Sequence, residues 1–290
     1  MKHGTTLSHQ QRVDLCAEVT NQEIVESLKA IGDDKDPGID GFNFFKKAWD
    51  IISMQIIDAM KECFSTEKLY KAITVLLLHW CLKLQKVIPY IICEAQAGFI
   101  LCRKIVNNVI LSHELVKVLQ TRAQISPRCM NKIDLQKAYD SVEWIFLQQV
   151  MEDLRFTDRF IRWIMECIKT VNYTILVNKE TTEPFIAAKD LRQGDHISPF
   201  LFAIVMEYFS RSLHGLKKEP DFQYHPRCRK LGITHANLGK SSVYFGGVKQ
   251  AVKDHIMAQL GFTSGSLLFK YTCIPLSTKK IALIQWQPLI

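Results

Sequence analysis

The order of helix-like and strand-like segments predicts an α+β fold for this chain of 290 residues. Helical periodicity dominates residues 20–120, and a strand, a helix, a hairpin, another helix and short strand-like pieces follow. Apolar residues make up 48% of the chain, which is enough to build a core and argues against global disorder.

The first helix signal covers residues 20–31. Thr20 and Glu23 have the spacing of a capping box, in which each residue bonds the backbone N–H of the other. The predicted buried face consists of Ile24, Leu28 and Ile31. Residues 32–43 hold one proline, three glycines and four aspartates, which break any periodicity and predict a loop.

A second helix is predicted over residues 44–64. Its expected buried face consists of Phe45, Trp49, Ile52, Ile56 and Met60. Residues 69–100 are apolar but show neither a clear helix start nor a turn signal, and residues 103–120 form the next predicted helix. The most apolar stretch, 73–82, is too short to span a bilayer, which needs about 20 residues.

The middle of the chain combines a strand, two helices and a hairpin. A strand over 129–135 reaches Asp134, and a helix is expected over 137–154. The predicted core face of that helix consists of Tyr139, Val142, Ile145, Phe146 and Val150. A helix over 157–169 precedes a hairpin whose strands, 172–178 and 184–188, are joined at "NKE".

The last third begins with an apolar helix over 197–213. Residues 210–230 hold six Lys or Arg against two acids, which predicts either a nucleic-acid-binding surface or a solvated loop. Beyond them, "SSVYFGG", "VKQAVKDHIMAQL" and "SLLFKYTC" predict short strand and helix pieces.

Charge and cysteine usage narrow the class of protein. The net charge of +8 suits a polyanionic partner such as nucleic acid, although ordinary basic proteins match it as well. The nine cysteines form no CxxC pair, and the first residues lack the apolar core of a signal peptide. We therefore expect reduced thiols without disulfide partners in an intracellular, non-membrane protein of the nucleus or cytoplasm. His225, Cys228 and His235 could hold zinc, but their spacing fits no finger pattern and favours a basic loop.

Asp134 is the first candidate for a chemical role. A carboxylate at the end of a buried strand is costly unless it binds something. Magnesium prefers oxygen ligands and often takes one or two carboxylates together with substrate phosphates. The alternative is that Asp134 caps the helix that follows it.

Four segments, in order, resemble the reverse transcriptases of LINE-type (non-LTR) retrotransposons of the plant type. "KIDLQKAYDSVEW" (132–144) and "LRQGDHISPFLFAIVMEYFSRSL" (191–213) resemble the first and second palm motifs. "DKDPGIDGFNFFKKAW" (34–49) and "EAQAGFILCRKIVNNVILSHELVK" (94–117) resemble segments of the fingers. The resemblance implies a right-hand polymerase fold, with fingers over 15–125, a palm over 126–245, a remnant over 246–290 and an unassigned segment 1–14.

The resemblance also implies roles for individual residues. Asp134 would be the catalytic acid that binds Mg²⁺, with the main-chain carbonyl of Leu135 as a second ligand. Tyr139 would pack under the sugar of the incoming nucleotide, and Gln193, Gly194 and Arg103 would face nucleotide or template. The implied partners are an RNA template and a DNA primer. Asp140 is expected to cap or orient the following helix.

The departures from the family pattern concern the same site. The third palm motif should bring two adjacent aspartates after "KLGITH" (230–235), but "ANLGKSSVYFGGV" (236–248) follows directly. The only adjacent aspartates of the chain are Asp33 and Asp34, in the wrong segment. An Arg-Pro-Ile phrase is missing near 71–83, and His196 stands in place of a proline. "ILCRKI" replaces a Pro-Gly-Arg turn, although Arg103 remains.

These losses predict an incomplete polymerase. The missing hairpin should remove part of the palm sheet and leave strand edges unpaired. We expect a degenerate product without polymerase activity. The alternatives are a residual nucleic-acid-binding module, and an active RNA-directed DNA polymerase that another chain completes.

Overall fold

The chain forms two compact units in the computed structural model. The structure describes residues 4–29, 48–66, 74–120, 127–135, 137–169, 172–174, 176–183, 185–186, 189–192, 194–215, 241–265, 269–271 and 274–276. The helical unit comprises Met1–Cys93, Phe99–Leu101 and Ala138–Pro226. The sheet unit comprises Glu94–Gly98, Cys102–Lys137 and Arg227–Ile290. Helices and strands both occur, as the predicted α+β class requires.

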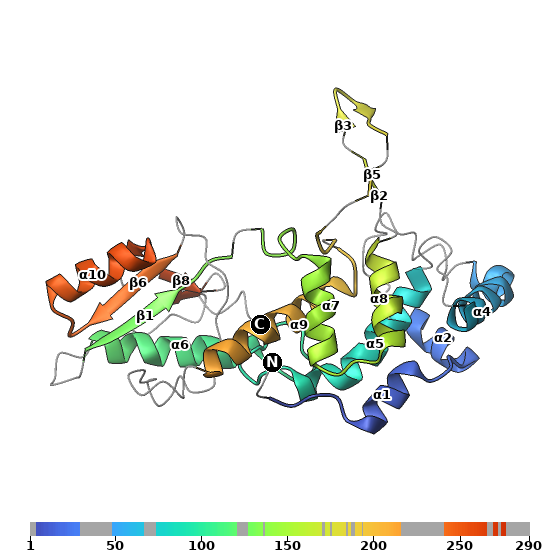
Figure 1. The fold of residues 1–290 in the computed structure, drawn as a ribbon, viewed down its shortest axis with the longest axis horizontal. Coiled ribbons are helices and arrows are strands. Elements are labelled where there is room, and N and C mark those ends of the chain that lie inside the picture. The colour runs from blue at the N-terminus through green and yellow to red at the C-terminus, as the bar shows by residue number, and fades with distance from the viewer. Residues whose placement is uncertain are drawn as a thin grey trace. The chain divides into compact units, whose positions relative to one another are not determined.

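The helical unit packs its helices around one apolar core (Figure 1). Its helices are α1 (His9–Cys16), α2 (Asn21–Lys29), α4 (Trp49–Thr66), α5 (Thr74–Ile91), α7 (Trp144–Asp153), α8 (Asp158–Lys169) and α9 (Ser198–Gly215). Helix α5 contacts α1, α2 and α9, and α7 contacts both α8 and α9. No helix among the described residues is long and apolar enough to cross a membrane.

Helix α5 occupies the apolar segment for which local signals predict no element. Trp80, Leu84, Ile88 and Ile91 recur every three or four residues and are all fully buried. A helix buried on most sides gains its stability from packing rather than from its own start signals. The absence of a clear start in the sequence therefore does not prevent a helix here.

Helices α2 and α4 largely follow the prediction. The capping box of α2 is confirmed, because Thr20 N–H donates to Glu23 Oε2 at 3.0 Å and Glu23 N–H donates to Thr20 Oγ1 at 3.2 Å. In α4, Ile56 and Met60 are buried as expected. Some of the predicted burial and the predicted loop cannot be compared with the structure. Leu28 is described only in its backbone, and Ile31, Phe45 and the loop 32–43 lie outside the described residues.

The prediction of a helix over 137–154 is wrong in its first part. Residues 137–141 form turns, and α7 begins only at Trp144. The carbonyl of Val142 accepts from Asp190 N–H at 3.0 Å, so the loop before α9 takes an acceptor that a longer helix would use internally. The later start places Leu147 in the core and leaves Ile145 73% exposed, against its predicted burial.

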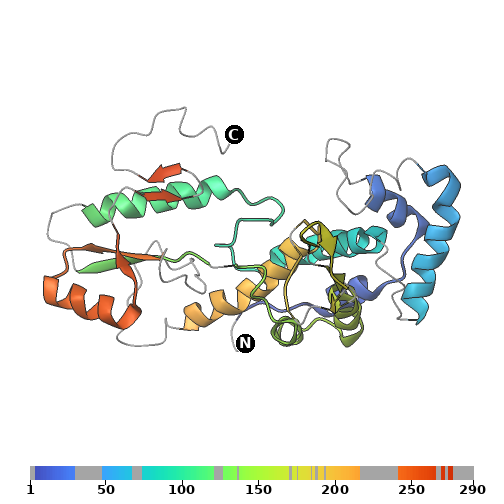
Figure 2. The same ribbon diagram turned by 90° about the horizontal axis from the view of Figure 1, so that it is seen from above.

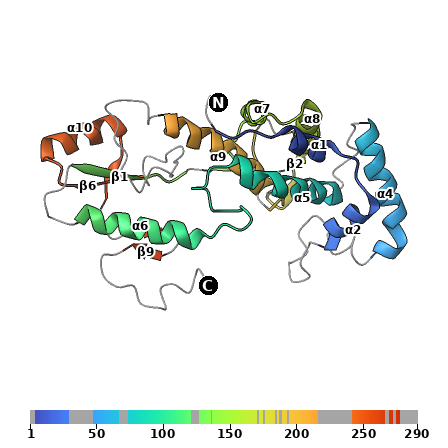
Figure 3. The same cartoon turned by 90° about the horizontal axis from the view of Figure 1, so that it is seen from below.

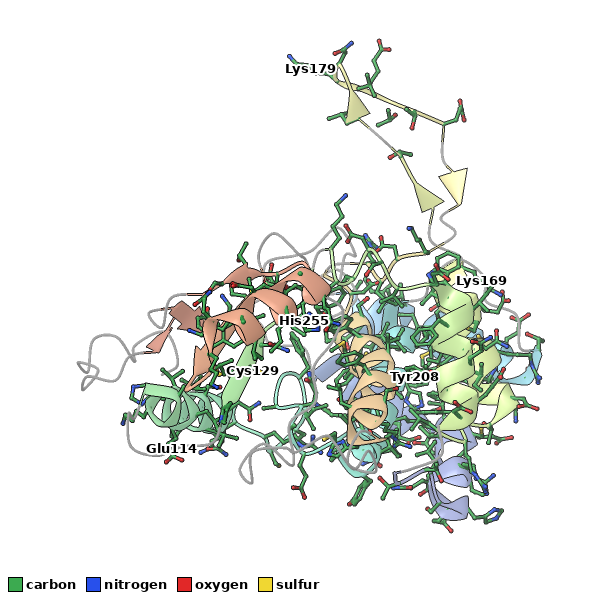
Figure 4. The ribbon with its side chains drawn as sticks, turned by 60° about the vertical axis from the view of Figure 1, so that its left-hand side comes forward. Glu114, Cys129, Lys169, Lys179, Tyr208 and His255 are labelled. Atoms are coloured by element: carbon green, nitrogen blue, oxygen red, sulfur yellow. The ribbon has the colours of Figure 1, made fainter. Side chains whose placement is uncertain are left out.

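A long hairpin leaves the helical unit after α8, as predicted. Strand β2 (Asn172–Tyr173) pairs with β5 (Phe185–Ile186), and β3 (Leu176–Val177) pairs with β4 (Glu180–Thr181). Asn178 and Lys179 form the two-residue turn with positive φ angles of 52° and 72°, the geometry of a type I′ turn. The hairpin projects away from the helices of its unit, with Lys179 at its tip (Figures 1 and 4).

The sheet unit holds a three-stranded sheet between two helices. Strand β1 (Arg128–Lys132) pairs antiparallel with β6 (Ser242–Gly246), and β6 pairs parallel with β7 (Thr263–Ser264). Helix α6 (Ile105–Gln120) covers one face, and α10 (Gln250–Leu260) lies on the other (Figures 1 and 3). The hairpin of β8 (Phe269–Tyr271) and β9 (Ile274–Leu276) lies beyond α6 (Figure 2).

Candidate active site

Asp134 follows β1 by two residues and is half-buried in the sheet unit. Its backbone N–H donates to Ser241 Oγ at 3.1 Å, and Ser241 is a fully buried residue immediately before β6. The carbonyl of Ser241 accepts in turn from Thr263 Oγ1 at 3.2 Å. Ser241 therefore connects the main chain at Asp134 with β6, which it precedes, and with β7, which contains Thr263.

The structure excludes the capping interpretations of the two motif aspartates. Helix α7 begins ten residues beyond Asp134 at Trp144, and its N-cap residue is Glu143. Asp140 lies in the turns before that helix and therefore does not cap it either. Strand β1, which Asp134 follows, is an edge strand of the sheet that the structure describes.

Tyr139 is half-buried in the helical unit. Its ring stacks on Phe202 of α9, with 4.8 Å between the ring centroids and 14° between the planes. Its carbonyl accepts from Leu191 N–H at 3.1 Å. Burial raises the pKa of the Tyr139 phenol, so the side chain stays neutral over the physiological range.

Gly194 is exposed in the loop between Leu191 and α9. Its φ angle is +99°, a conformation that residues with a Cβ rarely adopt. No atom lies within 4 Å of the place that a Cβ would occupy, so the glycine is required by the backbone angle rather than by crowding. Gln193 lies outside the described residues.

Arg103 is half-buried in the sheet unit and donates from Nη1 to the carbonyl of Gln96 at 2.8 Å. Cys102, beside it, has a positive φ of 65°. Glycine adopts such a φ angle without strain, so the turn at Cys102 has a conformation that suits glycine better than cysteine.

The predicted site residues are divided between the two units. Asp134, Leu135 and Arg103 belong to the sheet unit, whereas Tyr139 and Gly194 belong to the helical unit. Across the described part of the chain, no group of three or more His, Cys, Asp or Glu side chains is arranged to hold a metal ion. His225, Cys228 and His235 lie outside that part.

The predicted basic surface requires one correction. Arg211 is buried and forms an ion pair with Glu207 of the same helix, with 2.7 Å between Nε and Oε1. The other basic residues of the stretch, Lys217, Lys218, Arg227, Arg229 and Lys230, lie outside the described residues. The i, i+4 spacing of an acid and a base inside an apolar helix was the sequence signal for this pair.

For Ser241, which accepts the bond from Asp134, the sequence carries no comparable signal.

Comparison with known proteins decides the family. Residues 67–225, more than half of the chain, match the model of the reverse transcriptase (RNA-dependent DNA polymerase) family. The chain belongs to this family. The stretch matched contains Asp134, Tyr139 and Gly194.

Two curated relatives place this reverse transcriptase domain among retrotransposon proteins. An uncharacterized 149 kDa protein of transposon TX1 from Xenopus laevis is 23% identical over 254 residues, covering 75% of this chain and 19% of the relative. A retrovirus-related Pol polyprotein from the type-1 retrotransposable element R2 of Popillia japonica is 24% identical over 130 residues, covering 45% and 21%. The chain spans about a fifth of the length of each. The resemblance to non-LTR reverse transcriptases is thereby confirmed.

Reverse transcriptases use divalent metal ions and act on nucleic acids, so the fit of Asp134 to a metal site can be tested. Two-ion nucleotidyl transfer needs several converging carboxylates. Asp134 offers one carboxylate and Leu135 a carbonyl, and the only adjacent aspartates of the sequence, Asp33 and Asp34, lie outside the described residues. The residues present do not fit a two-ion centre.

Proposed function

We propose that this chain is an incomplete right-hand polymerase, an RNA-directed DNA polymerase by ancestry that no longer catalyses nucleotidyl transfer. The fingers-like region would cover 15–125 and the palm-like region 126–245, with a remnant of the region beyond the palm over 246–290. Residues 1–14 remain unassigned to either region.

The observation that carries the proposal is the single acid at the metal site. Two divalent ions about 4 Å apart repel each other strongly in a cleft of low dielectric constant. Several negative ligands must offset that repulsion, and Asp134 supplies one. Without paired ions, the attacking hydroxyl and the leaving oxygen of a nucleotide would lack their stabilising charge.

The pairing of β1 supports the loss of palm strands. Cys129 pairs with Phe245 and Lys132 pairs with Ser242, so β6 takes one edge of β1 over its full length. Among the described residues the other edge of β1 has no neighbouring strand. An unpaired edge is the expected consequence of losing the hairpin that carries the third motif.

The remaining family roles are proposed residue by residue. Asp134 and the carbonyl of Leu135 would keep a weak contact with Mg²⁺. Tyr139 would lie under a nucleotide sugar, and Gln193, Gly194 and Arg103 would face nucleotide or template. An RNA template and a DNA primer would be the partners of these residues.

Primer extension tests the proposal. Purified protein with a primed RNA template, Mg²⁺ or Mn²⁺ and four deoxynucleotides should give no product above a blank. Losing metal stabilisation costs at least several kcal/mol of barrier height, and each 1.4 kcal/mol is about tenfold in rate. Asp134→Ala and the matched variant Asp140→Ala should behave like the parent chain. Extension that Asp134→Ala abolishes and Asp140→Ala retains would contradict the proposal.

A further inference from the structure

Glu207 and Arg211 form a buried ion pair one turn apart on α9. Glu207 is 4% exposed and Arg211 is 7% exposed. Their charges are tolerated inside the helical unit because most of their polar atoms are bonded. Glu207 Oε2 accepts from the backbone N–H of Cys93 at 2.7 Å, while Oε1 binds Arg211 Nε. Arg211 Nη2 donates to the carbonyls of Thr5 at 2.6 Å and Ile91 at 2.9 Å.

The Glu207–Arg211 pair binds main-chain groups at and just after the end of α5. The last carbonyls of a helix have no partner within the helix and need one from elsewhere. At the end of α5, Arg211 binds the carbonyl of Ile91, and Thr5 Oγ1 donates to the carbonyl of Tyr90 at 2.6 Å. Glu207 binds the N–H of Cys93, the residue at which the chain leaves the helical unit for Glu94 of the sheet unit.

The N-terminal strap, residues Gly4–Leu7, contacts the guanidinium group of Arg211, whose Nη2 donates to the carbonyl of Thr5. Gly4 has a φ angle of +126°, and a Cβ added to it would lie 2.7 Å from Arg211 Cζ. At the other end of the strap, the N–H of the buried Leu7 donates to the carbonyl of Leu154 after α7 at 3.1 Å. Arg211 Nη1 is buried without an acceptor among the described residues, so the guanidinium depends on the bonds of its other two nitrogens.

We propose that the N-terminal strap and the Glu207–Arg211 pair act as one latch that closes the end of α5 and the exit of the chain at Cys93. Lifting the strap removes an acceptor from Arg211 and admits water to the pair. Buried charged networks respond as a unit, because a loss at one member leaves the charge of another uncompensated. Release of the strap is therefore coupled to release of the Cys93 amide, far away along the sequence.

Hydrogen exchange on the full chain tests the coupling. Gly4→Ala places a methyl group against Arg211 and forces an unfavourable φ, so exchange should accelerate about tenfold at both Leu7 and Cys93. Arg211→Lys keeps the charge but loses the planar fork that reaches two carbonyls, and it should accelerate the same two amides. Gly215→Ala is the matched control, because no atom lies within 4 Å of its added Cβ, and it should change neither amide.

The coupling would be overturned if Gly4→Ala accelerated Leu7 alone and left Cys93 as in the parent chain. Thr5→Val covers the case in which Gly4→Ala unfolds the whole unit. It removes the bond from Thr5 Oγ1 to the carbonyl of Tyr90 and leaves the guanidinium unobstructed. Several-fold faster exchange at Cys93 in Thr5→Val supports the latch, and unchanged exchange there refutes it.

Discussion

Acidification should destabilise the helical unit through His79. This side chain of α5 is 2% exposed, its ring packs edge-to-face with Phe64 with 5.7 Å between the ring centroids, and its Nε2 has no hydrogen-bond partner among the described residues. Burial, and after it the positive charge of Lys83 one turn later, lower the pKa of His79 to about 4. The carboxylate of Glu23 acts in the opposite direction but does not offset them.

The sign and size of the effect follow from the two pKa values. An unfolded histidine has a pKa of about 6.5, so below that pH the unfolded chain takes up a proton that the folded chain refuses. Full stability is therefore present above about pH 6.5 and is lost as the pH falls towards 4. The loss is about 2 kcal/mol at pH 5 and reaches about 3 kcal/mol well below pH 4, at roughly 1.4 kcal/mol per pKa unit.

Urea unfolding at pH 7.5 and pH 5.0 measures this loss, because Trp80 and Trp163 report on the core around Phe64. His79→Phe keeps an aromatic ring and cannot take up a proton. The parent chain should lose about 2 kcal/mol more than His79→Phe between the two pH values, since other titrating groups cancel in the difference. His9→Gln, at an exposed position of α1, should behave like the parent. Equal losses in parent and His79→Phe would refute the reasoning.

Three further substitutions test the backbone and the core. Cys102→Gly should stabilise the chain by about 1 kcal/mol in urea unfolding, because Cys102 has a φ of 65° that glycine adopts without strain. An unchanged free energy of unfolding would contradict this turn conformation. Leu147→Ala should lower the free energy of unfolding by about 2–5 kcal/mol, because Leu147 is fully buried. Ile145→Ala should change it by no more than about 0.5 kcal/mol, because Ile145 is 73% exposed. Similar losses in the two variants would contradict the start of α7 at Trp144.

Local signals predicted the elements that local interactions stabilise. The capping box of α2 involves Thr20 and Glu23 alone, and the hairpin turn depends on the conformations of Asn178 and Lys179. The start of α7 depends instead on bonds from residues 190 and 191 to the segment before it. Because these bonds connect residues far apart in the sequence, periodicity extended the helix too far back and assigned Ile145 to the core.

The same division holds for the candidate site. The position of Asp134 just beyond a strand could be predicted, since an apolar strand ending in a carboxylate is a local pattern. Its anchor Ser241 could not, because a serine at the start of a strand looks like many others. Arg211 was placed on a basic surface because charge runs usually face water. Its burial depends on Glu207 and on carbonyls of Thr5 and Ile91, which only the folded chain brings together.

A folded but inactive chain is physically consistent, because catalytic acids and folding depend on different interactions. Converging carboxylates repel one another in the absence of metal and contribute strain rather than stability. Ser241 Oγ accepts a hydrogen bond from the backbone N–H of Asp134, and this bond does not involve the carboxylate. The register of β1 with β6 is likewise made of backbone pairs from Arg128 to Lys132. The proposed loss of the third-motif acids would therefore remove nucleotidyl transfer while leaving intact the backbone pairing of β1 with β6.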